Sequence, residues 1–428
     1  MRIPRSLDFL IQSPLRRADI QPGLYHYVRE VEGAATRFHL RVDATGNGLL
    51  LANAAASARL AASGVIIAKG LLDGGDPAAV ARRARACFRR VSADQIASDV
   101  AAVQQLIGKL ASPAGDYPII NLADPAFSPK AAPLDRPISA DVPLCPPLWM
   151  MPLLDRLWNL GIPHVTFAVG NEPDHGALVR AIERAEDLGL ITGARGRGTD
   201  LCRGTRISEL ARAGLDHLDI CCLSVVDDVH NNLAGDGDRQ QVLQAFIAAR
   251  KHGLCAVAQV ALVRPTLPTI HETLEALAGR GVRDVGLFAI ATTDEAEAEA
   301  GALRAEELTP VARLVEETAE RLGVRLLWYP TLRFARGRPL GQQACGGPRC
   351  SGDTAIRVEP DGSVIPPRGP YVSAGNLLID DWETIERSEV FQNYRRRIES
   401  DTHCDQCPGL AICAADCPRN PAGWAEGE

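Results

Sequence analysis

The sequence predicts an α/β protein built around a partial (β/α)6 TIM-like barrel, with a winged-helix-like domain before it and a cysteine-rich domain after it. Three observations support this. Strand and helix patterns alternate between residues 138 and 331, a strand pair and three helical patterns fill residues 36–110, and six of the twelve cysteines follow Gly341. Repeated strand–helix units make neighbouring strands parallel, and six or seven such units form a full or partial barrel.

Composition limits the class of protein. A length of 428 residues predicts two to four domains at about 150 residues each. With 46% hydrophobic and 23% charged residues, the chain has the composition of an ordinary globular protein. A net charge of −7 disfavours nucleic-acid binding, which usually requires a basic face. The longest apolar runs, such as 254–263, are too short to cross a bilayer, and no apolar signal-peptide core follows the first residues. We therefore expect a cytoplasmic protein that binds neither nucleic acid nor membrane.

The N-terminal third combines a hairpin with helices. Within residues 36–54, a stretch of alternating apolar and polar residues is followed by a turn sequence and then by a second strand pattern, which predicts two paired strands. The expected helices cover residues 56–72, 76–88 and 94–110. Pro77 after Asp76 is a favourable helix start, because proline is tolerated in the first turn. Residues 1–112 are therefore predicted to form the winged-helix-like domain, and the Pro-, Ala-, Ser- and Asp-rich residues 113–137 a linker.

The barrel is predicted from seven strand patterns and the helical segments between them. The expected strands cover residues 138–145, 164–169, 189–194, 217–223, 256–263, 284–290 and 325–329. The expected helices cover residues 148–160, 174–187, 204–213, 237–252, 268–280 and 305–322. In such a barrel, chemistry occurs at the carboxyl ends of the strands. Arg195 and Arg197 lie at one such end, where they could form an anion pocket or a solvated loop.

The C-terminal segment carries the strongest chemical signal. Four cysteines in the pattern C-x2-C-x5-C-x3-C occupy positions Cys404, Cys407, Cys413 and Cys417. Cys345 and Cys350 precede a strand–turn–strand pattern over 354–366. A CxxC turn holds two sulfurs close enough for one ion to bridge them, and soft thiolates suit iron–sulfur clusters or zinc. Clustered cysteines in a cytoplasmic protein are more often metal ligands than disulfides. We therefore expect metal or cluster binding.

The turn after the second barrel strand resembles a known family. It reads Gly170-Asn171-Glu172-Pro173, preceded by Leu-Gly-Ile-Pro-His-Val-Thr-Phe-Ala-Val. This stretch is similar to the core of radical S-adenosylmethionine (SAM) enzymes. In those enzymes the turn is normally Gly-Gly-Glu-Pro, and its glutamate binds the amino group of the methionine part of SAM. The resemblance implies a barrel of radical SAM type and gives Gly170, Glu172 and Pro173 as candidate cofactor-binding residues.

The tail resembles the SPASM domain that accompanies these enzymes and carries auxiliary 4Fe–4S clusters. By that resemblance Cys345, Cys350 and Cys417 serve one cluster, and Cys404, Cys407 and Cys413 serve a second. Each set has three thiolates and one open position. A single zinc site from the last four cysteines is the competing arrangement, with a contribution to folding on the order of 10 kcal/mol. The barrel and tail are expected to cover 138–333 and 334–428.

The N-terminal order of elements, with Gly-Leu-Leu-Asp-Gly-Gly at 70–75, resembles the PqqD-like peptide-recognition domain. Domains of that type bind a leader peptide as an added strand on a sheet edge. A winged helix that binds no ligand remains the structural alternative.

The sequence departs from the family where the reactive cluster would bind. Radical SAM chemistry requires a CxxxCxxC loop after the first barrel strand, whose three thiolates hold a 4Fe–4S cluster that chelates SAM. Here that loop begins Cys145-Pro146-Pro147, and Cys145 is the only cysteine between Cys87 and Cys202. One thiolate cannot hold the cluster, so the resemblance does not extend to SAM cleavage and leaves open whether the chain is an enzyme.

Three functions follow from these features. The preferred hypothesis is a degenerate radical SAM/SPASM-like protein, a non-catalytic or accessory component of RiPP-type peptide maturation. It would bind a peptide or an active radical SAM maturase and carry one or two auxiliary 4Fe–4S clusters. The first alternative is an active peptide-modifying enzyme with non-standard cluster ligation. The second is a zinc-stabilised or electron-transfer protein. No residue is assigned as a catalytic acid, base or nucleophile.

Overall fold

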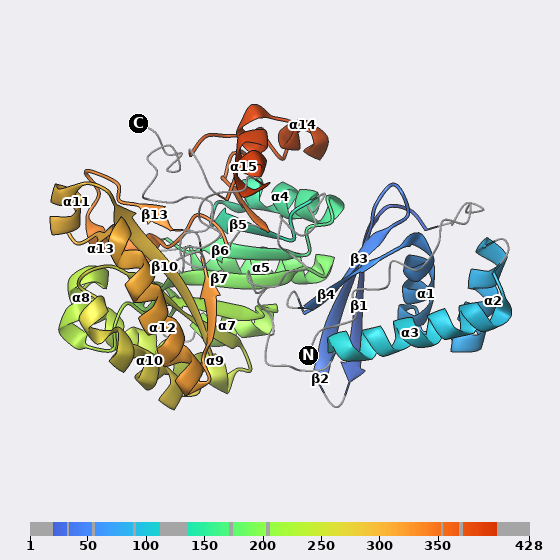
Figure 1. The fold of residues 1–428 in the computed structure, drawn as a ribbon, viewed down its shortest axis with the longest axis horizontal. Coiled ribbons are helices and arrows are strands. Elements are labelled where there is room, and N and C mark those ends of the chain that lie inside the picture. The colour runs from blue at the N-terminus through green and yellow to red at the C-terminus, as the bar shows by residue number, and fades with distance from the viewer. Residues whose placement is uncertain are drawn as a thin grey trace. The chain divides into compact units, whose positions relative to one another are not determined.

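The computed structural model places two compact units, residues 1–120 with 158–163, and 121–157 with 164–428 (Figure 1). The described residues are 20–31, 34–53, 56–88, 91–111, 136–170, 174–202, 206–329, 331–351, 354–367 and 371–399. Six of the residues predicted to bind a cofactor or metal lie outside these ranges: Glu172, Pro173, Cys404, Cys407, Cys413 and Cys417.

The first unit is a four-stranded antiparallel sheet followed by three helices (Figure 1). Its elements are β1 (Gly23–Val31), β2 (Ala34–Val42), β3 (Gly48–Ala52), β4 (Ala56–Leu60), α1 (Ala62–Leu72), α2 (Pro77–Cys87) and α3 (Ala93–Ala111). The hairpin expected over 36–54 is present as β2 and β3, and Asp76 caps α2 by accepting a hydrogen bond from the Ala79 amide at 3.0 Å.

Two sequence predictions in this unit need correction. Strand β1 was not expected, and the helix expected over 56–72 starts only at Ala62. Residues 56–60 instead pair with β3, in register from Gly48 opposite Leu60 to Ala52 opposite Ala56. Alanine favours helices by well under 1 kcal/mol per residue, so backbone pairing with a neighbouring strand overrides this preference.

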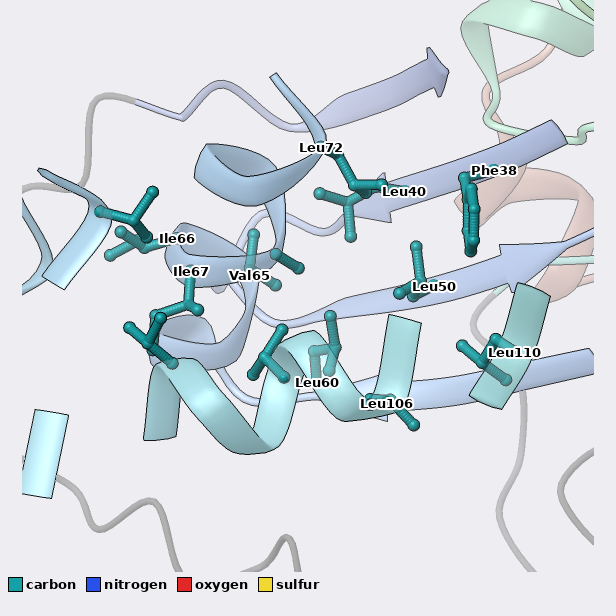
Figure 2. Packing of buried hydrophobic residues seen from close by; sticks show 14 of the residues in the cluster. Phe38, Leu40, Leu50, Leu60, Val65, Ile66, Ile67, Leu72, Leu106 and Leu110 are labelled. Atoms are coloured by element: carbon teal, nitrogen blue, oxygen red, sulfur yellow. The ribbon is translucent and has the colours of Figure 1, made fainter. Parts of the chain in front are cut away.

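The core of the first unit lies between the sheet and its helices (Figure 2). Phe38 and Leu40 alternate along β2 on the face that packs against α1 and α3, and both have no exposed surface. Val65 and Ile67 from α1 are also buried there. Burying side chains of this size stabilises the fold by about 1.5–3 kcal/mol each, so this core holds the helices on the sheet.

We predict that Phe38→Ala lowers the free energy of unfolding of the first unit by about 3–5 kcal/mol, because a large buried ring is replaced by a cavity. Hydrogen–deuterium exchange of the β2 and β3 amides measures this loss directly. Val28→Ala on β1 is the control, since Val28 is 58% exposed. Equal exchange rates in the two variants would contradict the assignment of Phe38 to the core.

The second unit is a curled, mostly parallel sheet with the order β11-β10-β9-β8-β7-β6-β5-β14-β15, and β12 and β13 also pair with β10. Its strands are β5 (Ser139–Pro143), β6 (His164–Ala168), β7 (Ile191–Arg197), β8 (His217–Cys221), β9 (Cys255–Leu262), β10 (Asp284–Thr292), β11 (Leu303–Arg304), β12 (Arg325–Trp328), β13 (Leu332–Arg333), β14 (Ala355–Val358) and β15 (Val364–Ile365).

The helices of this unit include those expected between the strands (Figure 1). They are α4 (Pro147–Asn159), α5 (His175–Leu188), α6 (Gly198–Leu201), α7 (Arg206–Ala213), α8 (Asp227–Ala234), α9 (Asp238–Lys251), α10 (Ile270–Gly279), α11 (Glu295–Glu299), α12 (Leu308–Leu322), α13 (Leu340–Gly346), α14 (Trp382–Glu386) and α15 (Glu389–Glu399), with 3-10 turns at Leu267–Thr269 and Ala305–Glu307. The predicted partial-barrel fold class is confirmed.

The third expected strand starts two residues later than predicted, because a glycine ends the preceding helix. It was expected over 189–194, but β7 begins at Ile191. Gly189 adopts φ 88° and caps α5, with its amide donating to the carbonyls of Ala185 and Glu186. Glycine reaches this left-handed conformation without a Cβ clash, so it ends the helix, and the strand starts after it.

The strand–turn–strand expected over 354–366 forms β14 and β15. Gly362 has φ 89° at the turn, and its amide donates to the Glu359 carbonyl at 2.8 Å. Strand β14 pairs in parallel with β5, with Ala355 opposite Ser139, so it extends the barrel sheet at that edge. Within the described ranges, no helix has both the length and the apolar composition needed to cross a membrane.

Candidate functional site in the barrel

Gly170 lies at the carboxyl end of β6, where barrel chemistry is expected. The amide of the preceding Val169 donates to the Arg195 carbonyl at 2.8 Å, and a Cβ at Gly170 would contact nothing within 4 Å. Asp174 caps α5 by accepting from the Ala177 amide at 3.0 Å. The cofactor-binding role of Gly170, Glu172 and Pro173 stays a prediction, since the last two lie outside the described residues.

The connection between β5 and α4 consists of residues 144–146 alone, because β5 ends at Pro143 and α4 begins at Pro147. The Leu144 amide donates to the Ala168 carbonyl at 2.9 Å, which holds the start of this connection on β6. Cys145 is buried, and burial raises the pKa of its thiol. The connection therefore presents one protonated thiol, which does not fit a cluster that needs three thiolates.

The inner face of the sheet is polar. Side chains alternate between the two faces of a strand, so one face carries Asp141 of β5, Thr166 of β6, Arg195 of β7 and Asp219 of β8. The phenol of Tyr329, which follows β12, interacts electrostatically with Asp219, Arg195 and Asp141. Tyr329 follows β12, which pairs with β10, whereas Asp141 lies on β5, several strands away in the same sheet. A side chain from one region of the sheet can interact with the other only if the sheet curls toward this face, so the polar face is the concave one.

A buried ion pair lies at the centre of this face. Arg195 Nη1 donates to Asp141 Oδ2 at 2.7 Å, and the two side chains are 4% and 0% exposed. Ser351 donates a further hydrogen bond to Asp141 Oδ1 at 2.7 Å. Burial acts to lower the pKa of Arg195, but the nearby Asp141 and Asp219 raise it above its usual value. The guanidinium therefore stays protonated. For Asp141, burial raises the pKa of the carboxyl, while Arg195 and the hydrogen bond from Ser351 act to lower it.

A hydrogen-bonded chain of side chains crosses the same face. Ser139 Oγ lies 2.9 Å from His164 Nδ1, His164 Nε2 lies 2.8 Å from His217 Nε2, and His217 Nδ1 lies 3.1 Å from Asp219 Oδ1. An ionised carboxylate only accepts, so with neutral rings the direction of donation runs from Ser139 to Asp219. A Cβ at Gly193 would lie 2.1 Å from the His217 ring, so glycine makes room for this chain.

Some polar atoms on the inner face have no hydrogen-bond partner among the described residues. They are Thr166 Oγ1, Arg195 Nη2, and Oε1 and Nε2 of Gln259, which is 1% exposed. Buried polar groups are normally satisfied by protein or water. The inner face therefore retains hydrogen-bonding capacity for water or a small polar molecule.

The structure decides one of the two alternatives for Arg195 and Arg197. Both lie within β7, Arg195 is buried and Arg197 pairs with Asp200 at 2.9 Å. The solvated loop is therefore wrong, and the anion pocket stays a prediction, with a carboxylate partner already on each guanidinium. Sequence reasoning missed the rest of the network, although His-x-Thr, Arg-x-Arg and His-x-Asp alternation in otherwise apolar strands is the signal that could have indicated it.

Cys345 and Cys350 are the only two predicted metal ligands within the described residues. Cys345 lies on α13, and its thiol lies 3.9 Å from the Leu233 carbonyl oxygen. Cys350 has no exposed surface. No three His, Cys, Asp or Glu side chains of the described part gather into a metal site. Thiolates are suitable donors for a cluster or zinc, and the assignment of all six cysteines stays a prediction.

We predict that Arg195→Met lowers the free energy of unfolding of the second unit by about 3–5 kcal/mol, because Asp141 is left buried without its counter-ion. Urea-induced unfolding of the second unit measures the loss. Arg184→Met is the matched control: Arg184 pairs with Asp155, but the two side chains are 39% and 44% exposed. Such a pair contributes no more than about 1 kcal/mol.

The double variant Asp141→Asn/Arg195→Gln removes both charges and keeps groups that can form hydrogen bonds. It is expected to recover part of the stability lost in Arg195→Met. If Arg195→Met and Arg184→Met are equally stable, the Asp141–Arg195 pair is not the centre of the inner face.

No family model matches the chain. A curated relative, the PqqA peptide cyclase of Bradyrhizobium diazoefficiens, is 26% identical over 282 residues, covering 62% of this chain and 71% of that protein. The crystal structure of Streptococcus suis SuiB bound to S-adenosylmethionine is 11% identical with a TM-score of 0.53, covering 94% of this chain and 99% of SuiB. SuiB bound to its precursor peptide SuiA also has a TM-score of 0.53 at 11% identity, covering 91% and 95%.

These relationships agree with the fold and with the motifs. The SuiB structures share the fold of this chain, and the PqqA peptide cyclase is related to it in sequence. The resemblance to the radical SAM/SPASM type, identified from the turn at Gly170 and from the cysteine-rich tail, is thereby confirmed as a similarity in fold and in sequence.

Proposed function

We propose that this chain is a non-catalytic or accessory component of peptide maturation, which binds a precursor peptide or an active maturase. The observation that carries the proposal is the connection between β5 and α4, which consists of residues 144–146 and holds the single buried thiol of Cys145. The fold is shared with SuiB, and this departure lies at the place where the radical-generating cluster would bind.

Peptide binding is supported by the relatives and by the first unit. One relative is named for the peptide that it cyclises, and SuiB was crystallised with a precursor peptide. In the first unit, β1 and β4 are the outer strands of the four-stranded sheet. An outer strand has backbone groups free to pair with a peptide added as a further strand. We therefore assign peptide recognition to residues 1–112, the PqqD-like domain.

Metal binding is assigned to the tail, residues 334–428. Cys404, Cys407, Cys413 and Cys417 are its closely spaced thiols, and Cys345 and Cys350 are the two further candidates. Auxiliary 4Fe–4S clusters would transfer electrons or stabilise the fold of the tail, whereas zinc would only stabilise its fold. SAM is not assigned a catalytic role here, because the residues after β5 do not fit the cluster that cleaves it.

We predict that the full-length protein, reconstituted with iron and sulfide without oxygen, forms no 5′-deoxyadenosine above background from SAM and dithionite. The reason is that Cys145 alone cannot hold the cluster that passes an electron to SAM. Liquid chromatography with mass spectrometry measures the product. A PqqA peptide cyclase prepared in parallel is the positive control. Product formed by this chain, and abolished by Cys404→Ala/Cys407→Ala, would instead support an active enzyme with non-standard cluster ligation.

We predict about eight irons per chain with matching sulfide if the tail holds two auxiliary clusters. Element analysis and sulfide assay of anaerobically purified protein measure this. Cys404→Ala/Cys407→Ala should lose about half of the iron, while the control Cys202→Ala should lose none. About one zinc per chain without sulfide would contradict the cluster assignment and identify a structural zinc site.

A further inference from the structure

Gln259 lies on the inner face in the carboxyl half of β9, between neighbours on β8 and β10. It is in register with Cys221 of β8 and with Gly286 of β10. Gly286 has no side chain, and a Cβ there would lie 2.4 Å from the Tyr329 ring. Gln259 is therefore flanked by a small thiol on one side and by an aromatic ring on the other, and it is only 1% exposed.

The segment after α13 covers the carboxamide of Gln259. Gly347, which follows α13, has φ 67°, and a Cβ there would lie 2.8 Å from Gln259 Oε1. Further along the segment, Ser351 donates to Asp141 Oδ1 at 2.7 Å. Residues 347–351 therefore reach from β9 to β5 across the inner face, although β6, β7 and β8 separate these strands in the sheet order.

A second buried glutamine, Gln343 of α13, shows how such a side chain supports the fold. Its Oε1 accepts from the Ala335 amide at 2.8 Å, and its Nε2 donates to the carbonyls of Ala335 and Arg338 at 3.2 and 2.8 Å. By contrast, neither polar atom of Gln259 has a hydrogen-bond partner among the described residues. Buried polar groups are normally satisfied, so the Gln259 carboxamide is available to something that the fold itself does not supply.

Two further atoms on the same face, Arg195 Nη2 and Thr166 Oγ1, have no partner within the described part of the chain. An arginine N–H only donates and a hydroxyl can accept, whereas a carboxamide has an oxygen that accepts twice and a nitrogen that donates twice. Together with the two atoms of Gln259, these donors and acceptors match the inventory of one carboxamide group. A carboxylate does not match, because it only accepts and would add a negative charge beside Asp141 and Asp219.

We propose that Gln259, with Arg195 and Thr166, binds a carboxamide group on the inner face beneath residues 347–351. Gln259 pairs with both ends of the group, Arg195 donates to its oxygen, and Thr166 accepts from its nitrogen. The group belongs either to a free small amide or to an Asn or Gln side chain of a bound peptide. Only the second source rests on the function proposed above, and the test below measures neither metal content nor 5′-deoxyadenosine, so the two proposals fail separately.

The test measures binding of acetamide to the full-length chain by saturation-transfer NMR, observed at the acetamide methyl protons. Transfer is expected for the wild-type protein and for Gln343→Met, and it should be lost in Gln259→Met. Thr166→Val keeps the shape of the side chain and should weaken acetamide binding by about two- to tenfold, which corresponds to the loss of one hydrogen bond. Acetate is the matched control ligand and should show no transfer.

Competition identifies the source of the carboxamide. If the tripeptide Gly-Gln-Gly displaces acetamide and Gly-Leu-Gly does not, the group comes from a peptide side chain. If neither tripeptide displaces acetamide, the site holds a free small amide. Displacement by both tripeptides would overturn the proposal, because no carboxamide side chain would then be needed.

Thermal unfolding separates recognition from a structural role. Gln259→Met removes two buried polar atoms that lack partners, so the Tm should stay the same or rise. Gln343→Met leaves the Ala335 amide without its partner and should lower the Tm by about 2–4 °C. Three results would overturn the proposal: Gln259→Met lowers the Tm as much as Gln343→Met, acetamide shows no transfer with the wild-type protein, or transfer occurs to SAM and not to acetamide. The last result would assign Gln259 to a cofactor site instead.

Discussion

The ion pair between Asp141 and Arg195 is the constraint on which the barrel depends, because it places two charges where a parallel sheet usually has apolar side chains. Removing such groups from water is expensive, and their mutual attraction offsets the expense only when the geometry is good and the remaining hydrogen bonds are made. Ser351 supplies one such hydrogen bond to Asp141, and Asp219 interacts electrostatically with the Arg195 guanidinium. Ser351 belongs to the segment after the barrel, so this segment is tied to the centre of the sheet.

The rest of the inner face follows from this arrangement. The chain from Ser139 through His164 and His217 to Asp219 satisfies the ring nitrogens on the strands beside the ion pair. Glycines at 193 and 286 leave space for the rings of His217 and Tyr329. A network of this kind is rigid when the hydrogen-bonding groups of each member have partners. Thr166, Gln259 and one nitrogen of Arg195 have none among the described residues, so they are the places where water or a small polar molecule would bind.

The connection after β5 separates this chain chemically from the proteins whose fold it shares. Radical generation needs a cluster that is held by three thiolates and open at one iron, and residues 144–146 supply one thiol that burial keeps protonated. The proposed binding role rests on this difference.

By itself, the sequence determined the alternation of strands and helices, the hairpin of residues 354–366, the missing cysteines after β5 and the relationship to the radical SAM/SPASM type. These features are local: hydrophobic periodicity, turn glycines and motif spacing are properties of neighbouring residues. Only the tertiary structure decided that residues 56–60 form a strand, that Arg195 pairs with Asp141, and that His164 meets His217. Each of these depends on which distant segments pack side by side, which no local pattern in one sequence specifies.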